Sequence, residues 1–150
     1  MDISYFLSVV IPIYNEEHRI KDTLERVVSY LSEKNFNWEL ILVNDGSTDR
    51  SVDIIEKFKQ KSENSFVNSN TGSYRVIILN NNENRGKGYA VRKGILNSCG
   101  RYVLFTDADN SVPIEEVEKL LNYLNDGFDI AIGSKGLRES MVIKPRLIRW

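Results

Sequence analysis

The sequence predicts an α/β fold, a three-layer, doubly wound domain built on a mostly parallel sheet. Short apolar runs alternate along the chain with segments whose apolar residues recur at helical spacing. Strands that alternate with helices pair in parallel through right-handed crossovers. The apolar runs are also continuous, which is typical of strands covered on both faces. The 150 residues suit one domain.

The first half of the chain is expected to hold two strands, two helices and a loop. Leu7–Ile13 is a continuous apolar run, and Ile20–Leu31 carries apolar residues at helical spacing. Leu40–Val43 is the second apolar run, and a second helical pattern covers Val52–Phe58. The polar stretch Ser62–Ser73, rich in Ser and Asn, is expected to be a flexible loop.

The second half continues the alternation. Arg75–Leu79 predicts a third strand, Gly88–Leu96 a short helix and Tyr102–Phe105 a fourth strand. Pro113–Leu124 predicts a further helix, since proline is favoured at its start and acidic residues in its first turn. The apolar run Phe128–Ile132 predicts a fifth strand.

Composition narrows the possible functions. The net charge is −1, and the chain has no basic patch interleaved with aromatic residues, so we expect no nucleic-acid partner. Cys99 is the only cysteine, which excludes an internal disulfide; we expect it to be a small buried residue. The start of the chain is not a signal peptide, and no apolar stretch approaches the ~20 residues that span a bilayer. We expect the protein in the cytoplasm or on the cytoplasmic face of a membrane.

The last ten residues, 141–150, mix apolar and basic side chains without a closing element. We expect residues 1–150 to form a single domain at the N-terminal side of a longer protein. The basic and apolar residues at the end are compatible with a membrane surface, although a shortened piece of ordinary fold explains them as well.

Polar turns follow three of the expected strands. They are Tyr14–Glu17, Asn44–Ser47 and Asp107–Asn110. The carboxyl ends of parallel strands lie on one edge of a sheet, where ligands bind. The sequence therefore predicts a site at this edge, built from carboxylates that are far apart along the chain.

Asp107 and Asp109 carry the most informative of these carboxylates. Residues two apart in an extended segment point to the same side, and paired carboxylates suit Mg²⁺ or Mn²⁺. Such ions keep several waters and contact substrate phosphates, so a diphosphate site is expected here. An acidic turn exposed to solvent is the alternative.

Two other turns allow both a binding and a structural interpretation. Asp45 can accept from a nucleobase or a ribose, while Asp49 can cap the following helix. The loop Asn84–Ala90 contains Gly86 and Lys87 before a helix start, which suits a phosphate, although a basic surface loop is the alternative. His18, the only histidine, is expected at the surface.

Four motifs occur in order along nearly the whole chain: Val10–Glu17, Val43–Asp49, Asn84–Gly88 and Asp107–Asp109. Together they resemble the family 2 glycosyltransferases with the GT-A fold. The loop at Asn84–Gly88 and Ile132–Ser134 look most like the dolichyl- or polyprenyl-phosphate glucosyltransferases of that family.

The resemblance implies transfer of a sugar, with inversion, from a nucleotide sugar to a lipid phosphate. UDP-glucose is the implied donor, and GDP-mannose remains an alternative. It implies catalytic and metal-binding roles for Asp107 and Asp109 with Mg²⁺ or Mn²⁺. The residues it implies in substrate binding are Pro12, Tyr14, Glu16, Asp45, Lys87, Ala108 and Lys135. Lys135 stands where relatives commonly have arginine, so Arg138 is an alternative to it.

Other activities remain open from the residues alone. Transfer to a saccharide hydroxyl would need a general base, and no obvious base is present, since His18 is misplaced. This fits a phosphate acceptor, and it also fits a shortened chain that has lost its base. A chain that binds a donor without transferring sugar is an alternative that is harder to exclude. Leu104–Ser111 also resembles the nucleophile segment of haloacid dehalogenase phosphohydrolases, and a receiver-like domain is a further alternative.

Overall fold

The computed structural model describes residues 5–65, 72–134 and 136. Contacts divide the chain into two compact units, Met1–Ile114 and Glu115–Trp150. The expectations for Lys135, Arg138 and the segment 141–150 lie outside the described residues. Within the described residues, no helix is both long and apolar enough to cross a membrane.

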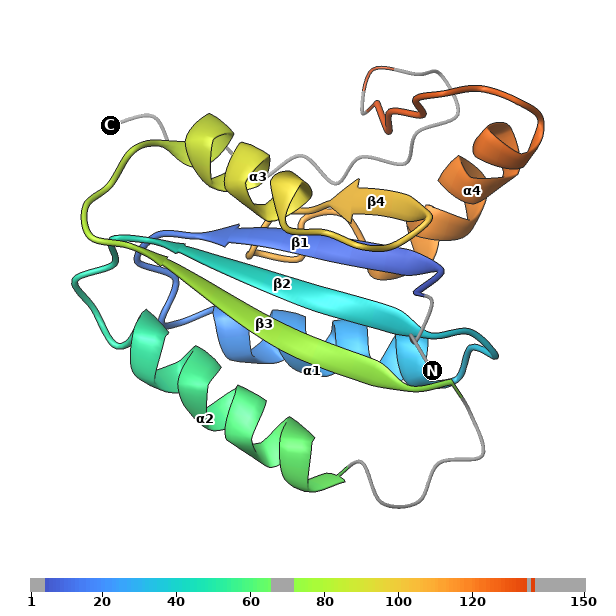
Figure 1. Ribbon diagram of the computed structural model, residues 1–150. Coiled ribbons are helices and arrows are strands. Elements are labelled where there is room, and N and C mark those ends of the chain that lie inside the picture. The colour runs from blue at the N-terminus through green and yellow to red at the C-terminus, as the bar shows by residue number, and fades with distance from the viewer. Residues whose placement is uncertain (1–4, 66–71, 135, 137–150) are drawn as a thin grey trace. The chain divides into compact units, whose positions relative to one another are not determined.

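Four parallel strands form the sheet of the first unit. They are β1 (Leu7–Ile13), β2 (Trp38–Asp45), β3 (Tyr74–Asn81) and β4 (Tyr102–Phe105), in the spatial order β3-β2-β1-β4. Leu7 pairs with Trp38 on one side and with Tyr102 on the other. All four arrows point the same way in Figure 1, so the turns after β1, β2 and β3 leave one end of the sheet.

Helices cover both faces of this sheet. α1 (Ile20–Ser32) and α2 (Ser51–Ser65) lie on one face, and α3 (Lys87–Leu96) lies on the other, against β1 and β2 (Figure 1). The mostly parallel α/β fold predicted from the sequence is thus confirmed. The predicted loop Ser62–Ser73 was placed too early, because α2 continues to Ser65; residues 66–71 lie outside the described part.

The two central strands supply the core. Every residue of β2 is buried, as is every residue of β1 except Pro12, because helices and strands surround both. Gly94 of α3 is buried against Val10, and a Cβ at this position would collide with the Val10 side chain. The missing side chain lets α3 approach the sheet closely and fixes the height of that helix over β1.

The second unit was only partly predicted. Its helix α4 (Val117–Asn125) follows a short 3₁₀ turn at Ile114–Glu116, as the pattern after Pro113 indicated. Gly127, with φ of +97°, then turns the chain. The predicted strand Phe128–Ile132 is wrong, because these residues have no strand conformation. A strand depends on backbone hydrogen bonds to a neighbouring strand, and an apolar run alone does not supply them.

A buried carboxylate ties the strands together at their amino ends. Glu39 of β2 is fully buried, and its Oε1 accepts hydrogen bonds from Ser8 Oγ at 2.5 Å and Cys99 N–H at 2.6 Å. Its Oε2 accepts from Arg75 Nε at 2.8 Å and Nη2 at 2.6 Å. This network joins β1, β2, β3 and the turn before β4. Cys99 itself is exposed, which corrects the prediction that it is buried; its backbone, rather than its thiol, reaches the interior.

These contacts set the pKa of Glu39. Burial raises it, but the hydrogen bonds from Cys99, Ser8 and Arg75 outweigh burial and hold the pKa below its ordinary value of 4.5. The ionised form therefore contributes stability that is fully present above about pH 4.5 and is lost as the pH falls through the lowered pKa.

We expect Glu39→Gln to destabilise the protein by about 2 kcal/mol at pH 7, because hydrogen bonds to a charged group are lost. Urea unfolding at a series of pH values measures the difference from wild type. The difference should narrow as the pH falls below about 4.5. Glu56→Gln makes the same change at an exposed site of α2 and should show almost no difference. A Glu39 difference that does not vary with pH would contradict this explanation.

Candidate functional site

A pocket of about 400 Å³ opens at the carboxyl ends of β1, β2 and β4. It brings together eight of the nine residues predicted to act in the site; Lys135 is the ninth and lies outside the described residues. The residues that line it are Pro12, Ile13, Tyr14, Glu16, Asp45, Asn84, Gly86, Lys87, Ala90, Asp107, Ala108 and Asp109.

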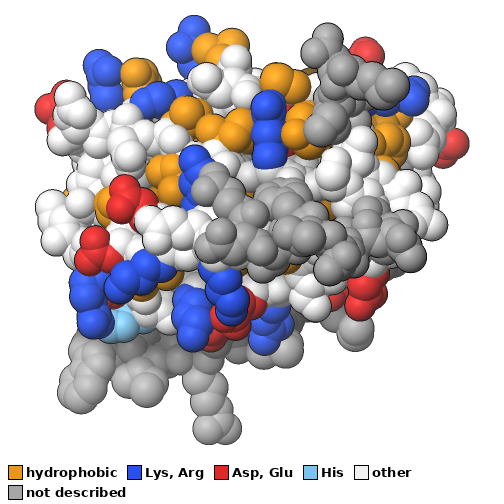
Figure 2. Space-filling model, turned by 60° about the horizontal axis from the view of Figure 1, so that its bottom comes forward, with side chains coloured by type: hydrophobic (Ala, Val, Ile, Leu, Met, Phe, Trp, Pro, Cys, Tyr) orange, Lys and Arg blue, Asp and Glu red, His pale blue; other side chains and the backbone are white. Residues whose placement is uncertain are grey.

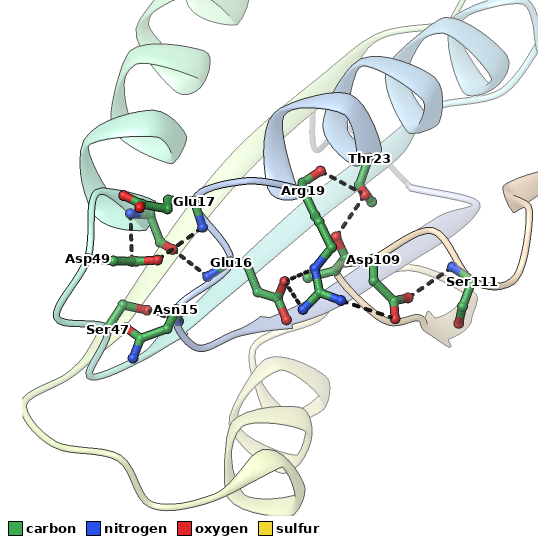
Figure 3. A network of polar contacts seen from close by, with 11 residues as sticks. Asn15, Glu16, Glu17, Arg19, Thr23, Ser47, Asp49, Asp109 and Ser111 are labelled. Carbon is green, nitrogen blue, oxygen red and sulfur yellow. Dashed lines mark hydrogen bonds and ion pairs between the residues drawn. The ribbon is translucent and has the colours of Figure 1, made fainter. Parts of the chain in front are cut away.

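The turn after β1 is held by the turn after β2 (Figure 3). Asn15 adopts a positive φ of 55°, its N–H donates to Ser47 Oγ at 3.1 Å, and its Oδ1 accepts from Thr48 N–H at 2.8 Å. The N–H of Glu16 donates to Ser51 Oγ at 2.8 Å. These bonds fix the backbone between Tyr14 and Glu16, which both line the pocket.

Asp49, in the turn after β2, also binds the turn after β1. Its Oδ1 accepts from Ser51 N–H at 2.9 Å, so it caps α2 as predicted, and its Oδ2 accepts from Glu17 N–H at 3.0 Å. In return, Glu17 Oε2 accepts from Arg50 N–H at 3.1 Å and Arg50 Nε at 3.0 Å. The capping residue thus also anchors the turn after β1 (Figure 3).

Asp45 holds in place the loop Asn84–Gly88, which we call the glycine loop. It is the last residue of β2 and is almost fully buried, with 2% of its surface exposed. Its Oδ1 accepts from Asn81 Nδ2 at 2.7 Å and Arg85 N–H at 3.0 Å, and its Oδ2 accepts from Gly86 N–H at 2.8 Å. A carboxylate has about four acceptor positions, so one remains. The contact of Asp45 with a nucleobase stays a prediction.

The backbone that leads into the glycine loop also packs closely against Gly46. This residue has a φ of +72°, and a Cβ there would lie 2.5 Å from the carbonyl carbon of Glu83. Glycine is therefore required both by the backbone conformation and by the close approach of the loop.

Lys87 reaches the first aspartate of the acidic pair. It is the first residue of α3, and its Nζ lies 2.5 Å from Asp107 Oδ1. Asp107 follows β4, whose pairing with β1 extends to a hydrogen bond from Thr106 N–H to Val10 O at 3.0 Å. A cationic side chain and a carboxylate that line the pocket are thus in direct contact.

Asp109 is positioned by different partners. Its Oδ1 accepts from Ser111 N–H at 2.9 Å, and its Oδ2 lies 3.9 Å from Arg19 Nη1. Partial burial raises the pKa of Asp109, but the Ser111 hydrogen bonds and the charge of Arg19 outweigh it and hold the pKa below 3.8. Asp109 is therefore ionised at neutral pH and available to a cation.

The start of α1 contributes two residues that the sequence reading missed. Arg19 donates to Glu16 Oε2 through Nε at 2.8 Å and Nη2 at 2.7 Å, and so links Glu16 to Asp109 (Figure 3). Thr23 Oγ1 donates to the buried carbonyl oxygen of Ala108 at 2.7 Å. The spacing of Glu16, Arg19 and Thr23, three and four residues apart, places them on one side of a helical turn and was a usable signal.

The sequence profile described as "Glycosyl transferase family 2" matches residues 8–147, nearly the whole chain. The chain belongs to glycosyltransferase family 2. Among its relatives, the dolichyl-phosphate beta-glucosyltransferase of Saccharomyces cerevisiae is 38% identical over 162 residues, which is 99% of this chain and 47% of the yeast protein. The chain thus spans about half the length of this relative.

Solved structures of other glycosyltransferases share the fold. The mannosyltransferase PcManGT from Pyrobaculum calidifontis, solved with GDP-Man and Mn²⁺, superposes with a TM-score of 0.64 at 20% identity, covering 84% of this chain and 36% of its own. The glucosyl-3-phosphoglycerate synthase of Mycobacterium tuberculosis, solved with Mn²⁺, UDP-Glc and phosphoglyceric acid, gives 0.56 at 24% identity, covering 82% and 40%.

The acidic residues of this family 2 domain fit a divalent cation that shares its coordination with a substrate. The described residues contain no group of three or more His, Cys, Asp or Glu side chains arranged to hold a metal. Asp107 and Asp109 nevertheless line one pocket with carboxylate oxygens, the ligands that Mg²⁺ and Mn²⁺ prefer. Two carboxylates suffice when phosphates and waters complete the coordination.

Electrostatics around the pocket are mixed. His18, as predicted, is at the surface, with 84% of its side chain exposed, 3.4 Å from Glu17 Oε1, and does not line the pocket. In the lower part of the face in Figure 2, Lys and Arg side chains lie beside Asp and Glu side chains. Charges of both signs are thus present on that part of the surface.

We expect Thr23→Val to destabilise this family 2 domain by about 1–2 kcal/mol, because the buried carbonyl of Ala108 loses its donor. Urea unfolding measures the loss. Thr23→Ser keeps the hydroxyl and should retain most of the stability. If Thr23→Val were as stable as wild type, the hydrogen bond from Thr23 to Ala108 would not hold the segment Asp107–Asp109 in place.

Proposed function

We propose that this chain is the donor-binding part of an inverting glycosyltransferase that moves glucose from UDP-glucose to dolichyl phosphate or a similar polyprenyl phosphate. One observation carries the proposal: the turns after β1, β2 and β4 and the glycine loop all line the same pocket. The name and 38% identity of the yeast relative support the sugar and the acceptor.

The pocket offers a different surface to each part of the donor. Pro12 and the half-exposed ring of Tyr14 provide apolar surface for the uracil, with Asp45 and Glu16 as acceptors for its N–H and the ribose hydroxyls. The diphosphate would then occupy the end of the pocket that Lys87, Asp107 and Asp109 line.

The diphosphate end combines several features that stabilise negative charge. α3 begins at Lys87, so the positive end of its dipole and the ammonium group of Lys87 act together. Asp107 and Asp109 would hold Mg²⁺ or Mn²⁺, which supplies Lewis-acid neutralisation of the departing diphosphate. The solved neighbours that carry Mn²⁺ with a nucleotide sugar support this assignment.

The reaction is a single displacement at the sugar C1. An oxygen of the lipid phosphate forms the new bond to C1 as the bond from C1 to the diphosphate oxygen breaks, and UDP leaves with the electron pair. A phosphate acceptor is already anionic at neutral pH and therefore needs no general base. A sugar hydroxyl would need a general base, and His18 does not line the pocket.

The proposal predicts a donor preference that thermal unfolding can measure. UDP-glucose with Mn²⁺ should raise the melting temperature, since a ligand bound only to the folded state stabilises it. GDP-mannose with Mn²⁺, and UDP-glucose without a divalent ion, should give smaller shifts. A larger shift with GDP-mannose would overturn the donor assignment, and transfer of labelled glucose to a polyprenyl phosphate tests the complete reaction.

The acidic pair makes a second prediction. Asp107→Asn should lower the affinity for UDP in the presence of Mn²⁺ by about tenfold or more, because one charged ligand is lost. Isothermal titration calorimetry with UDP, with and without Mn²⁺, measures this loss. Asp53→Asn makes the same chemical change at an exposed position of α2 and should bind UDP as wild type does. Unchanged affinity of Asp107→Asn would exclude the metal role.

A further inference from the structure

The contact between Lys87 and Asp107 joins a residue proposed to bind the diphosphate to one proposed to bind the metal. We propose that Lys87 is shared between Asp107 and the donor diphosphate, and that this exchange couples the binding of the divalent cation to that of the donor. The inference rests on the proposed function and adds a means of regulating the same site. Its physical basis is the 2.5 Å separation of Lys87 Nζ and Asp107 Oδ1.

The position of Lys87 is unfavourable for the helix that carries it. A positive charge in the first turn of a helix opposes the helix dipole, and acidic residues are favoured there. The first turn of α3 contains no acidic residue. Helix stability therefore does not explain a lysine at this position, whereas a nearby carboxylate and an arriving phosphate both do.

The Lys87–Asp107 pair is also suited to exchange. Both side chains are substantially exposed, 58% for Lys87 and 45% for Asp107, and ion pairs between exposed groups are weak. The ammonium group can move to another anion without leaving a buried charge behind. Glu39, whose carboxylate is fully buried beneath Arg75, is the opposite case in the same fold.

A cation that uses Asp107 must compete with Lys87. Asp107 Oδ1 is in contact with Lys87 Nζ, whereas the nearest atom of Arg19 is 3.9 Å from Asp109 Oδ2. Lys87 is therefore the closer competitor for the acidic pair. Its ammonium group lowers the affinity for a divalent ion both by occupying an oxygen and by charge repulsion.

The donor removes this competition. A diphosphate at the start of α3 gives the ammonium group of Lys87 a more highly charged partner than a single carboxylate, and Asp107 becomes free for the cation. Donor binding thereby strengthens cation binding, and by linkage the cation strengthens donor binding by the same factor. Direct contact between cation and diphosphate adds to this coupling, so loss of Lys87 should reduce the coupling without abolishing it.

Arg85 provides a matched control two residues away. Its guanidinium group lies over the ring of Tyr89, 4.4 Å from the centroid, and Nη1 donates to Tyr89 Oη at 3.1 Å. Lys87→Met and Arg85→Met therefore remove the same charge from the same loop. Only the first removes the contact with Asp107. A difference between them separates the specific contact from the general charge.

The test measures Mn²⁺ affinity by electron paramagnetic resonance of free Mn²⁺, first without nucleotide and then with saturating UDP. Without UDP, Lys87→Met should bind Mn²⁺ about three- to fivefold more tightly than wild type, the scale of an exposed ion pair. Arg85→Met should stay within about twofold of wild type, since its charge is farther away. The factor by which UDP strengthens Mn²⁺ binding should fall in Lys87→Met by at least the same three- to fivefold, and Lys87→Arg should restore most of it.

The outcomes distinguish this inference from the proposed function. If UDP strengthens Mn²⁺ binding to wild type but Lys87→Met binds Mn²⁺ alone no more tightly, the exchange is wrong and the donor site stands. If Arg85→Met gains as much Mn²⁺ affinity as Lys87→Met in the absence of UDP, the exchange is also wrong. If UDP does not strengthen Mn²⁺ binding to wild type, both the exchange and the metal-assisted donor site are wrong. Thermal unfolding of each variant verifies that it is folded.

Discussion

Two carboxylates buried at opposite ends of β2 organise the rest of the first unit. A buried charge is tolerated only when hydrogen bonds replace its water. Glu39 obtains them from β1, β3 and the turn before β4, and Asp45 obtains them from Asn81 and the glycine loop. Strand β2 therefore determines where its neighbours begin at one end and how the loops close at the other.

The two ends have different consequences. At the amino end, a guanidinium group, a hydroxyl and an amide converge on Glu39 and close the interior, where that carboxylate is not accessible to a ligand. At the carboxyl end, the side chain of Asn81 and the backbone N–H groups of the glycine loop satisfy Asp45. Lys87 and Asp107 line the pocket at the same end, where both side chains are substantially exposed.

Sequence patterns predicted what depends on local periodicity and strand order. The four strands, the three helices of the first unit and the convergence of distant turns follow from apolar patterns and parallel pairing. The burial of Asp45 did not, because an Asp-Gly-Ser sequence is typical of a turn and the extension of β2 to Asp45 depends on pairing with β3. The strand predicted at Phe128–Ile132 is absent because an apolar pattern alone does not form a strand without a neighbour to pair with. Arg19 offered a local signal in its spacing from Glu16, but its contact with Asp109 spans ninety positions of the chain (109 − 19), which local patterns do not contain.

The packing of Gly46 against the backbone of Glu83 makes the turn after β2 and the residues that lead into the glycine loop depend on each other. Any side chain at position 46 would displace the backbone that leads to the glycine loop. A change in the length or path of residues 83–86 therefore requires a matching change in the turn after β2. Among homologues, the two segments should be inherited as a matched pair, and exchanging one of them between distant relatives would disrupt the pocket even if every charged residue were kept.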